Sequence, residues 1–119
     1  TFADSIFHVG ALGAGQVGKM VNNLILWACI SANHEGFRLA EALGVDPQRL
    51  RTALVESSAS NWAMQTQIHK QPMPWAEKDM RIVLGEADKL RIAMPLSGVV
   101  KEVVKSIKYE LGWPTPEEH

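Results

Sequence analysis

The sequence predicts an all-α domain. Apolar residues recur at helical spacing through most of the chain, and glycines and prolines separate the periodic segments. Only one short stretch, residues 6–9, has the pattern of a strand, so no parallel sheet can be assembled from this chain. With 119 residues the chain forms one domain that is large enough to bury a core. We expect one long central helix followed by about four shorter helices.

The long helix is expected to begin near Ala14 and to continue to about Leu43, where Gly44 provides a left-handed C-terminal cap. Its length of roughly 30 residues exceeds that of the usual globular helix. Apolar residues cover more than one of its faces, which predicts that neighbouring helices bury it on several sides. Cys29 lies within this apolar segment and is interpreted as a core residue rather than a nucleophile.

Two shorter helices are expected to follow. Asp46 and Pro47 provide an N-cap and a proline at the first helical position of the second helix. A third helix should run from Asn61 to about His69, and the residues expected to face inward are Trp62 and Met64 or Ile68. Prolines exclude residues 71–74 from a helix interior, so this segment is expected to be a loop.

The last two helices are expected over about Trp75 to Arg91 and from Pro95 to about Leu111. The apolar positions expected to face inward are Met80, Val83, Leu84, Ala87, Leu90, Val99, Val100, Val103, Val104 and Ile107. The lysines of the last helix are expected to form a solvated face balanced by interleaved glutamates: Lys101, Lys105 and Lys108 with Glu102 and Glu110.

Composition excludes several functional classes. The 12 Lys and Arg against 13 Asp and Glu give a net charge of −1, which disfavours binding to nucleic acid or an anionic membrane. The longest apolar run, residues 24–30, is too short to span a bilayer, and no signal peptide is visible. The single cysteine excludes an internal disulfide, and the scattered histidines make a metal site unexpected. We therefore expect a soluble, cytoplasmic protein.

Three glycines near the N-terminus, Gly13, Gly15 and Gly18, have the spacing of a dinucleotide-binding fingerprint. That fingerprint requires a second parallel strand after one helix, ending in an acidic residue that holds the ribose. Residues 19–44 instead predict one unbroken helix. The glycines are better interpreted as a helix start that allows another backbone to approach closely.

Lys19, Asn22 and Asn23 lie on one face of the first turns of the long helix. A lysine there loses solvation unless it meets a ligand, a carboxylate or a water-filled cleft. The alternative is that Lys19 extends into solvent while the asparagines cap or bridge neighbouring groups, and spacing alone favours this alternative. The pair Lys78–Asp79, taken alone, is likewise typical of electrostatic capping at a helix N-terminus.

The segment HVGALGAGQVGKMVNN resembles the signature that opens the C-terminal domain of the β-hydroxyacid dehydrogenase family, which includes 3-hydroxyisobutyrate dehydrogenase and tartronate semialdehyde reductase. The matching positions are Gly10, Gly13, Gly15, Lys19, Asn22 and Asn23. The pair Lys78–Asp79 is similar to a second element of the family. This resemblance covers nearly the whole chain and implies a fold like the C-terminal domain of 6-phosphogluconate dehydrogenase.

The resemblance implies an NAD(P)-dependent oxidoreductase that interconverts a small β-hydroxyacid and its semialdehyde. Residues 1–12 would end an N-terminal Rossmann domain that is otherwise absent from this chain, and residues 13–119 would form the helical substrate and oligomerisation domain. The missing domain would bind most of the NAD or NADP, so this chain alone is expected to be inactive. The complete protein is expected to be a homodimer or homotetramer.

The resemblance also implies roles for individual residues. Lys19 would be the catalytic acid/base, Asn23 and Gly15 would bind the substrate, and Lys78 would reach the nicotinamide end of the cofactor. The alternative function is a non-catalytic helical oligomerisation module in which Lys19 is a solvated residue at the helix start.

Overall fold

The structure, a computed structural model, describes residues 13–114. Within this range the chain forms, without any strand, α2 (Ala14–Ala42), α3 (Pro47–Leu54), α4 (Trp62–Thr66), the 3-10 turn η1 (Ile68–Lys70), α5 (Ala76–Leu90) and α6 (Pro95–Leu111). The prediction of an all-α domain is confirmed. The expected strand at residues 6–9 and the assignment of residues 1–12 to a preceding domain lie outside the described residues. No helix in the described range has the length and hydropathy needed to cross a membrane.

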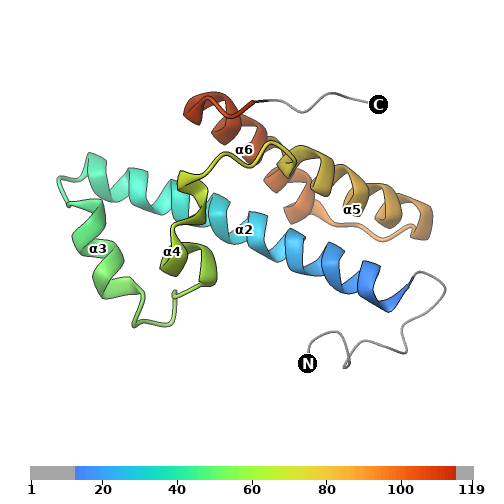
Figure 1. Cartoon of the computed structure of the whole chain (residues 1–119), viewed down its shortest axis with the longest axis horizontal. Helices are drawn as coiled ribbons and strands as arrows, with labels where there is room; N and C mark the ends of the chain where they lie inside the picture. Colours follow the sequence, from blue (N-terminus) through green and yellow to red (C-terminus); the bar gives the residue numbers. More distant parts are fainter. Residues whose placement is uncertain (1–12, 115–119) are drawn as a thin grey trace.

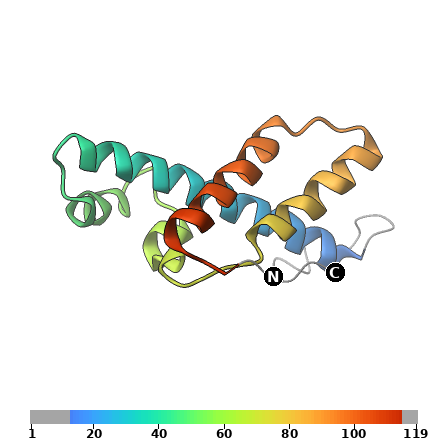
Figure 2. The same cartoon turned by 90° about the horizontal axis from the view of Figure 1, so that it is seen from above.

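The long helix α2 is the centre of the molecule, and all the other α-helices pack against it (Figure 1). α3 and α4 lie along its C-terminal half, whereas α5 and α6 form a hairpin that packs on it as a unit (Figure 2). The molecule measures 50 × 33 × 25 Å. Neighbouring helices therefore contact α2 on several sides, but its burial is less complete than its apolar pattern predicts, since Val21, Ile25 and Leu39 are 44%, 56% and 63% exposed.

Local signals set the helix ends where the sequence predicts them. Gly44 has a φ of +87° at the end of α2, and the amide of Val45 reaches back to the Ala40 carbonyl over 2.9 Å. The Asp46 side chain accepts a hydrogen bond from the Gln48 amide over 3.0 Å, and Pro47 occupies the first position of α3. These caps fix the direction in which the chain leaves α2.

The core lies where α2, α4, α5 and α6 meet. Its buried members are Trp27, Ile30, Ala63, Met73, Ala76, Met80, Val100, Val104, Ile107 and Trp113. The inward positions predicted for Met80, Val83, Ala87, Val100, Val104 and Ile107 are therefore confirmed. Cys29 is only half-buried.

The third predicted helix is shorter than expected. Gln67 has a φ of 53°, which ends α4 after Thr66, and η1 follows. The start of α4 is tied to α2 by a reciprocal pair of amide hydrogen bonds, 3.0 and 2.9 Å long, between Asn33 and Asn61. In this orientation Met64 is buried and Trp62 is 57% exposed, so the prediction that Trp62 faces inward is wrong.

Two apolar positions of the α5–α6 hairpin also differ from prediction. Leu90 and Val99 were expected to face inward but are 67% and 60% exposed. Both residues lie within a few positions of the connection between α5 and α6, residues 91–94, which forms the end of the hairpin (Figure 2).

Lys108, in contrast to Leu90 and Val99, is less exposed than predicted. It was expected on a solvated face but is only 4% exposed. Its Nζ donates hydrogen bonds to the Pro74 carbonyl and to Glu77 Oε1, both at 3.0 Å, because α6 packs against the loop that leads into α5. By contrast, Lys105 is exposed and pairs with Glu102, as the sequence predicts.

Candidate active site

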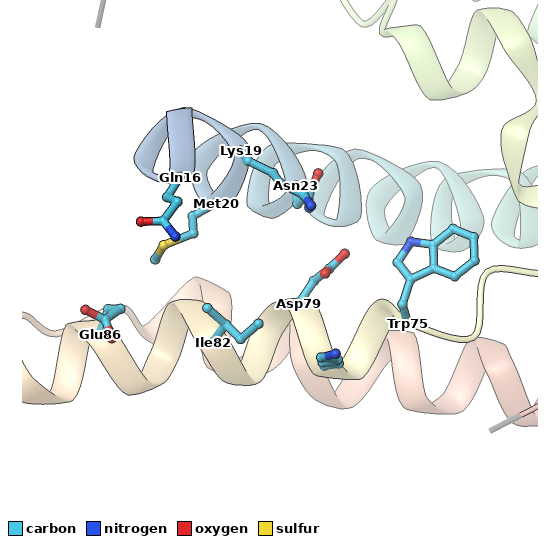
Figure 3. A pocket seen from close by; sticks show the side chains of 9 residues that line it. Gln16, Lys19, Met20, Asn23, Trp75, Asp79, Ile82 and Glu86 are labelled. Carbon is cyan, nitrogen blue, oxygen red and sulfur yellow. The ribbon is translucent and has the colours of Figure 1, made fainter. Parts of the chain in front are cut away.

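A cleft of about 720 Å³ separates the first half of α2 from α5 (Figure 3). Its walls carry polar and charged side chains from both helices: Gln16, Lys19, Met20, Asn23, Trp75, Lys78, Asp79, Ile82 and Glu86. The cleft therefore joins residues from two distant segments of the sequence, including both elements of the motif pattern.

The α2 wall is a single helix face. Lys19, Asn23 and Trp27 follow one another at intervals of four residues, so their side chains project on the same side of the helix. Lys19 is exposed, Asn23 is half-buried and Trp27 is fully buried. The face thus runs from solvent at the start of α2 into the core.

The α5 wall begins at Trp75, the residue that precedes the helix, and places Lys78 and Asp79 in its first turns. The Asp79 carboxylate points across the cleft towards α2 (Figure 3). Its Oδ2 accepts a hydrogen bond from Trp27 Nε1 over 3.1 Å. The Asp79 side chain therefore bridges the two helices.

The surroundings of Asp79 alter the ionisation of its carboxyl group. Burial raises the pKa of Asp79, whereas the Trp27 hydrogen bond and the positive charges of Lys19 and Lys78 act to lower it. The cleft thus holds one carboxylate that is influenced by a cation from each wall.

The first turn of α5 is held in place by α6, which contacts it through Lys108. The two hydrogen bonds of Lys108 link α6 to the Pro74 carbonyl and to Glu77, which immediately precedes Lys78. Site residues on such an anchored turn are positioned more accurately than residues on a free loop.

Three of the predicted site residues, Lys19, Asn23 and Lys78, line the cleft together. Gly15 lies exposed in the first turn of α2 and does not line it. Asn22 is exposed, and its amide donates to the Asn23 side chain over 3.4 Å. The spacing of Lys19 and Asn23 is therefore the sequence signal that locates the α2 wall.

Sequence reasoning did not identify Trp27 as part of the site. Trp27 is one of the apolar residues of the long helix, and it continues the four-residue spacing of Lys19 and Asn23. That spacing is the signal that could have found it. The bond from Trp27 to Asp79 joins residues 52 positions apart, which no local pattern encodes.

The cleft offers hydrogen-bond donors to an anionic organic group, next to the carboxylates of Asp79 and Glu86. Two lysines and the Asn23 amide can interact with carboxylate or phosphate oxygens. Within residues 13–114, no group of three or more His, Cys, Asp or Glu residues is arranged to hold a metal ion.

A second cavity, of about 860 Å³, lies on another side of α2 and is mostly apolar. It is bounded by α2, α3, α4 and the start of α6, and we call it the apolar groove; its members include Leu24, Ile25, Phe37, Leu50, Leu54 and Leu96. Ile25 and Leu96 are 56% and 66% exposed, so the groove opens to the surface.

Comparison with known proteins identifies relatives among the dehydrogenases. The chain is 29% identical to a 3-hydroxyisobutyrate dehydrogenase of Pseudomonas aeruginosa, with 83% of the chain and 39% of the relative covered. It is 30% identical to the glyoxylate/succinic semialdehyde reductase 2 of Arabidopsis thaliana, with 87% and 32% covered. A probable 3-hydroxyisobutyrate dehydrogenase of Mycobacterium bovis is 41% identical, with 54% and 22% covered. The chain spans less than half the length of each of these relatives.

A family model supports the same relationship. Residues 13–115 match the model described as NAD-binding of NADP-dependent 3-hydroxyisobutyrate dehydrogenase. The match includes both walls of the cleft and all the described helices. The chain therefore belongs to this family of NAD-binding domains of NADP-dependent 3-hydroxyisobutyrate dehydrogenase.

Proposed function

We propose that this chain is the C-terminal helical part of an NAD(P)-dependent oxidoreductase that interconverts a small β-hydroxyacid and its semialdehyde. The observation that carries the proposal is the convergence of Lys19, Asn23 and Lys78 on one cleft. In this proposal residues 1–12 end a Rossmann domain that supplies most of the NAD or NADP site, and residues 13–119 close the cleft over the substrate.

Lys19 is the proposed acid/base. In the oxidation, its neutral amine takes the proton of the substrate hydroxyl while the adjacent C–H bond breaks and the carbon–oxygen bond becomes a carbonyl. The nicotinamide, when bound, accepts the hydride from that carbon. In the reduction, the ammonium form of Lys19 returns the proton to the carbonyl oxygen. A helix-borne amine suits this role because the base must stay within hydrogen-bond reach of its proton.

The neighbouring residues are proposed to orient the substrate and the cofactor. Asn23 lies one turn after Lys19 and can donate its amide N–H to the carboxylate or hydroxyl of a small acid. Gly15, one turn before Lys19, is proposed to contact the substrate as well, at the exposed start of the helix. Lys78, on the opposite wall, is proposed to contact the nicotinamide end of the cofactor.

The test is Lys19→Met in the complete protein, assayed with NAD and NADP and a panel of small β-hydroxyacids. Methionine keeps much of the side-chain length but cannot transfer a proton, so kcat should fall by at least about 100-fold while the circular dichroism spectrum is unchanged. Lys105→Met removes an exposed lysine from α6 and serves as the matched control. Turnover by Lys19→Met within a few-fold of wild type would contradict the proposal. Hydride transfer by residues 1–119 alone would contradict the assignment of the cofactor site to another domain.

Assembly is a second proposed role. The open apolar groove supports a homodimer or homotetramer, because an exposed apolar surface of this kind is typical of an interaction site. Assembly and catalysis are compatible, since the cleft and the groove use different residues. A protein that assembles but shows no loss of turnover in Lys19→Met would fit the oligomerisation module instead.

A further inference from the structure

Trp27 links the core of the domain to Asp79, a residue that lines the cleft. Its side chain is 0% exposed, yet its Nε1 reaches Asp79 on the opposite wall. A buried indole N–H needs an acceptor, and a partly buried carboxylate needs a donor. The bond of 3.1 Å satisfies both groups and fixes where the carboxylate lies between α2 and α5.

The same helix face carries the proposed acid/base. Lys19 lies two turns before Trp27 and lines the same cleft as Asp79. The other charged groups that line the cleft are Lys78 and Glu86 on α5. Behind that wall, Glu77 is already paired with Lys108 of α6. Of the two carboxylates that line the cleft, Asp79 is the one that accepts a hydrogen bond from α2.

We propose that Trp27 is a positioning residue for the reaction: its indole N–H holds the Asp79 carboxylate at the cleft wall, where the carboxylate charge orients the Lys19 amine towards the substrate. This inference rests on the proposed acid/base role of Lys19. Trp27 itself touches no reacting atom and acts through Asp79.

The direction of the effect follows from the forces on Asp79. Burial raises its pKa, and the Trp27 hydrogen bond acts against this by favouring the ionised form. Removal of the N–H should therefore raise the Asp79 pKa further and allow the carboxyl to become protonated at a higher pH. The protonated carboxyl no longer attracts the Lys19 amine, so the acid limb of the activity profile should move to higher pH.

The first experiment does not depend on turnover. In the complete protein labelled with ¹⁵N, the indole resonance of Trp27 should titrate with the ionisation of Asp79, and Asp79→Asn should abolish this titration. Because the positive charge of Lys19 lowers the Asp79 pKa, the midpoint should rise in Lys19→Met and stay unchanged in Lys105→Met. The inference would be overturned if the Trp27 indole resonance did not change with pH. It would also be overturned if the midpoint of its titration were the same in Lys19→Met as in wild type.

The second experiment measures the consequence for catalysis. Trp27→Phe removes the N–H but keeps an aromatic ring; it should lower kcat at neutral pH by about tenfold and shift the acid limb of kcat/KM to higher pH. Trp113→Phe makes the same exchange elsewhere in the same core and should leave the profile unchanged. A folded Trp27→Phe with the wild-type profile would refute the positioning role.

The outcomes separate this inference from the proposed function. If Lys19→Met keeps its turnover, the acid/base assignment fails, whatever the Trp27 resonance does. If Lys19→Met is inactive but Trp27→Phe has the wild-type profile, only the positioning role fails. If Trp27→Phe does not fold, the resonance midpoints of the wild type and of Lys19→Met decide the question.

Discussion

The cleft and the apolar groove use different sides of the same helix. The cleft is lined on the α2 side by Gln16, Lys19, Met20 and Asn23, and the buried Trp27 lies one turn after Asn23. The groove takes Ile25, Cys29 and Ala32 of the same helix, at spacings typical of another face. One face carries charge and the other is apolar, so the proposed chemistry and the proposed assembly would use different side chains of one helix. The predictions below test that separation.

The largest effect is expected where the cleft meets the core. Trp27→Ala removes a fully buried indole and should lower the free energy of unfolding by about 3–5 kcal/mol, as measured by urea denaturation. Cys29→Ala, on the groove side of the same helix, removes one half-buried sulfur and should cost less than about 1.5 kcal/mol. If the free energy of unfolding fell equally in Trp27→Ala and Cys29→Ala, the cleft face and the groove face of α2 would be equally well packed, and the comparison would fail.

A smaller effect is expected behind the α5 wall. Lys108→Met keeps an apolar stem in the buried position but removes both hydrogen bonds, so it should lower the free energy of unfolding by about 1–3 kcal/mol. Lys105→Met disrupts only an exposed pair with Glu102 and should change stability by less than about 0.5 kcal/mol. If Lys108→Met and Lys105→Met changed the free energy of unfolding by the same amount, Lys108 would not anchor the first turn of α5.

These two lysines also show what the sequence can and cannot predict. Helix ends depend on neighbouring residues, so Asp46, Pro47 and Gly44 predict them well. Exposure depends on which elements become neighbours. The pattern therefore placed both Lys105 and Lys108 in solvent, although the loop at Pro74 covers only Lys108.

The site follows the same rule. The shared face of Lys19 and Asn23 was predictable, because a helix places residues four apart on one side. Spacing alone favoured a solvated Lys19, and only the resemblance to the family indicated a site there. Lys78 was predictable only from its resemblance to a family motif, since nothing local shows that α5 will face α2. The bond from Trp27 to Asp79 required the packed structure, because it depends on the approach of two helices far apart in the chain.

On the groove, a charge should affect assembly more than folding. Leu96→Lys places a cation on an apolar wall and should weaken self-association by about 10- to 100-fold, as measured by analytical ultracentrifugation of the complete protein. Leu90→Lys is the matched control, because Leu90 is equally exposed, at 67% against 66%, but lies outside the groove. If both variants kept the wild-type mass, the groove would not be the assembly surface.

The smallest effect concerns the pH dependence of stability. Burial raises the pKa of Asp79 above its ordinary value of 3.8, so the folded state binds this proton more tightly than the unfolded state does. The ionised carboxyl therefore lowers stability at pH values above the raised pKa, and protonation restores that stability as the pH falls through it. Asp79→Asn stays neutral and can still accept the Trp27 hydrogen bond through its amide oxygen.

Asp79→Asn should therefore be more stable than wild type near pH 7, by less than about 1 kcal/mol, and the advantage should disappear as the pH falls to the ordinary range of aspartate. Urea denaturation across this pH range measures it, with exposed Asp88→Asn on the same helix as the control. A wild-type protein that is the more stable one at neutral pH would mean that the Trp27 bond and the two lysines outweigh burial. If Asp79→Asn instead gains stability and loses turnover, Asp79 lowers the stability of the fold but is needed for activity. No residue of the apolar groove is expected to behave in this way.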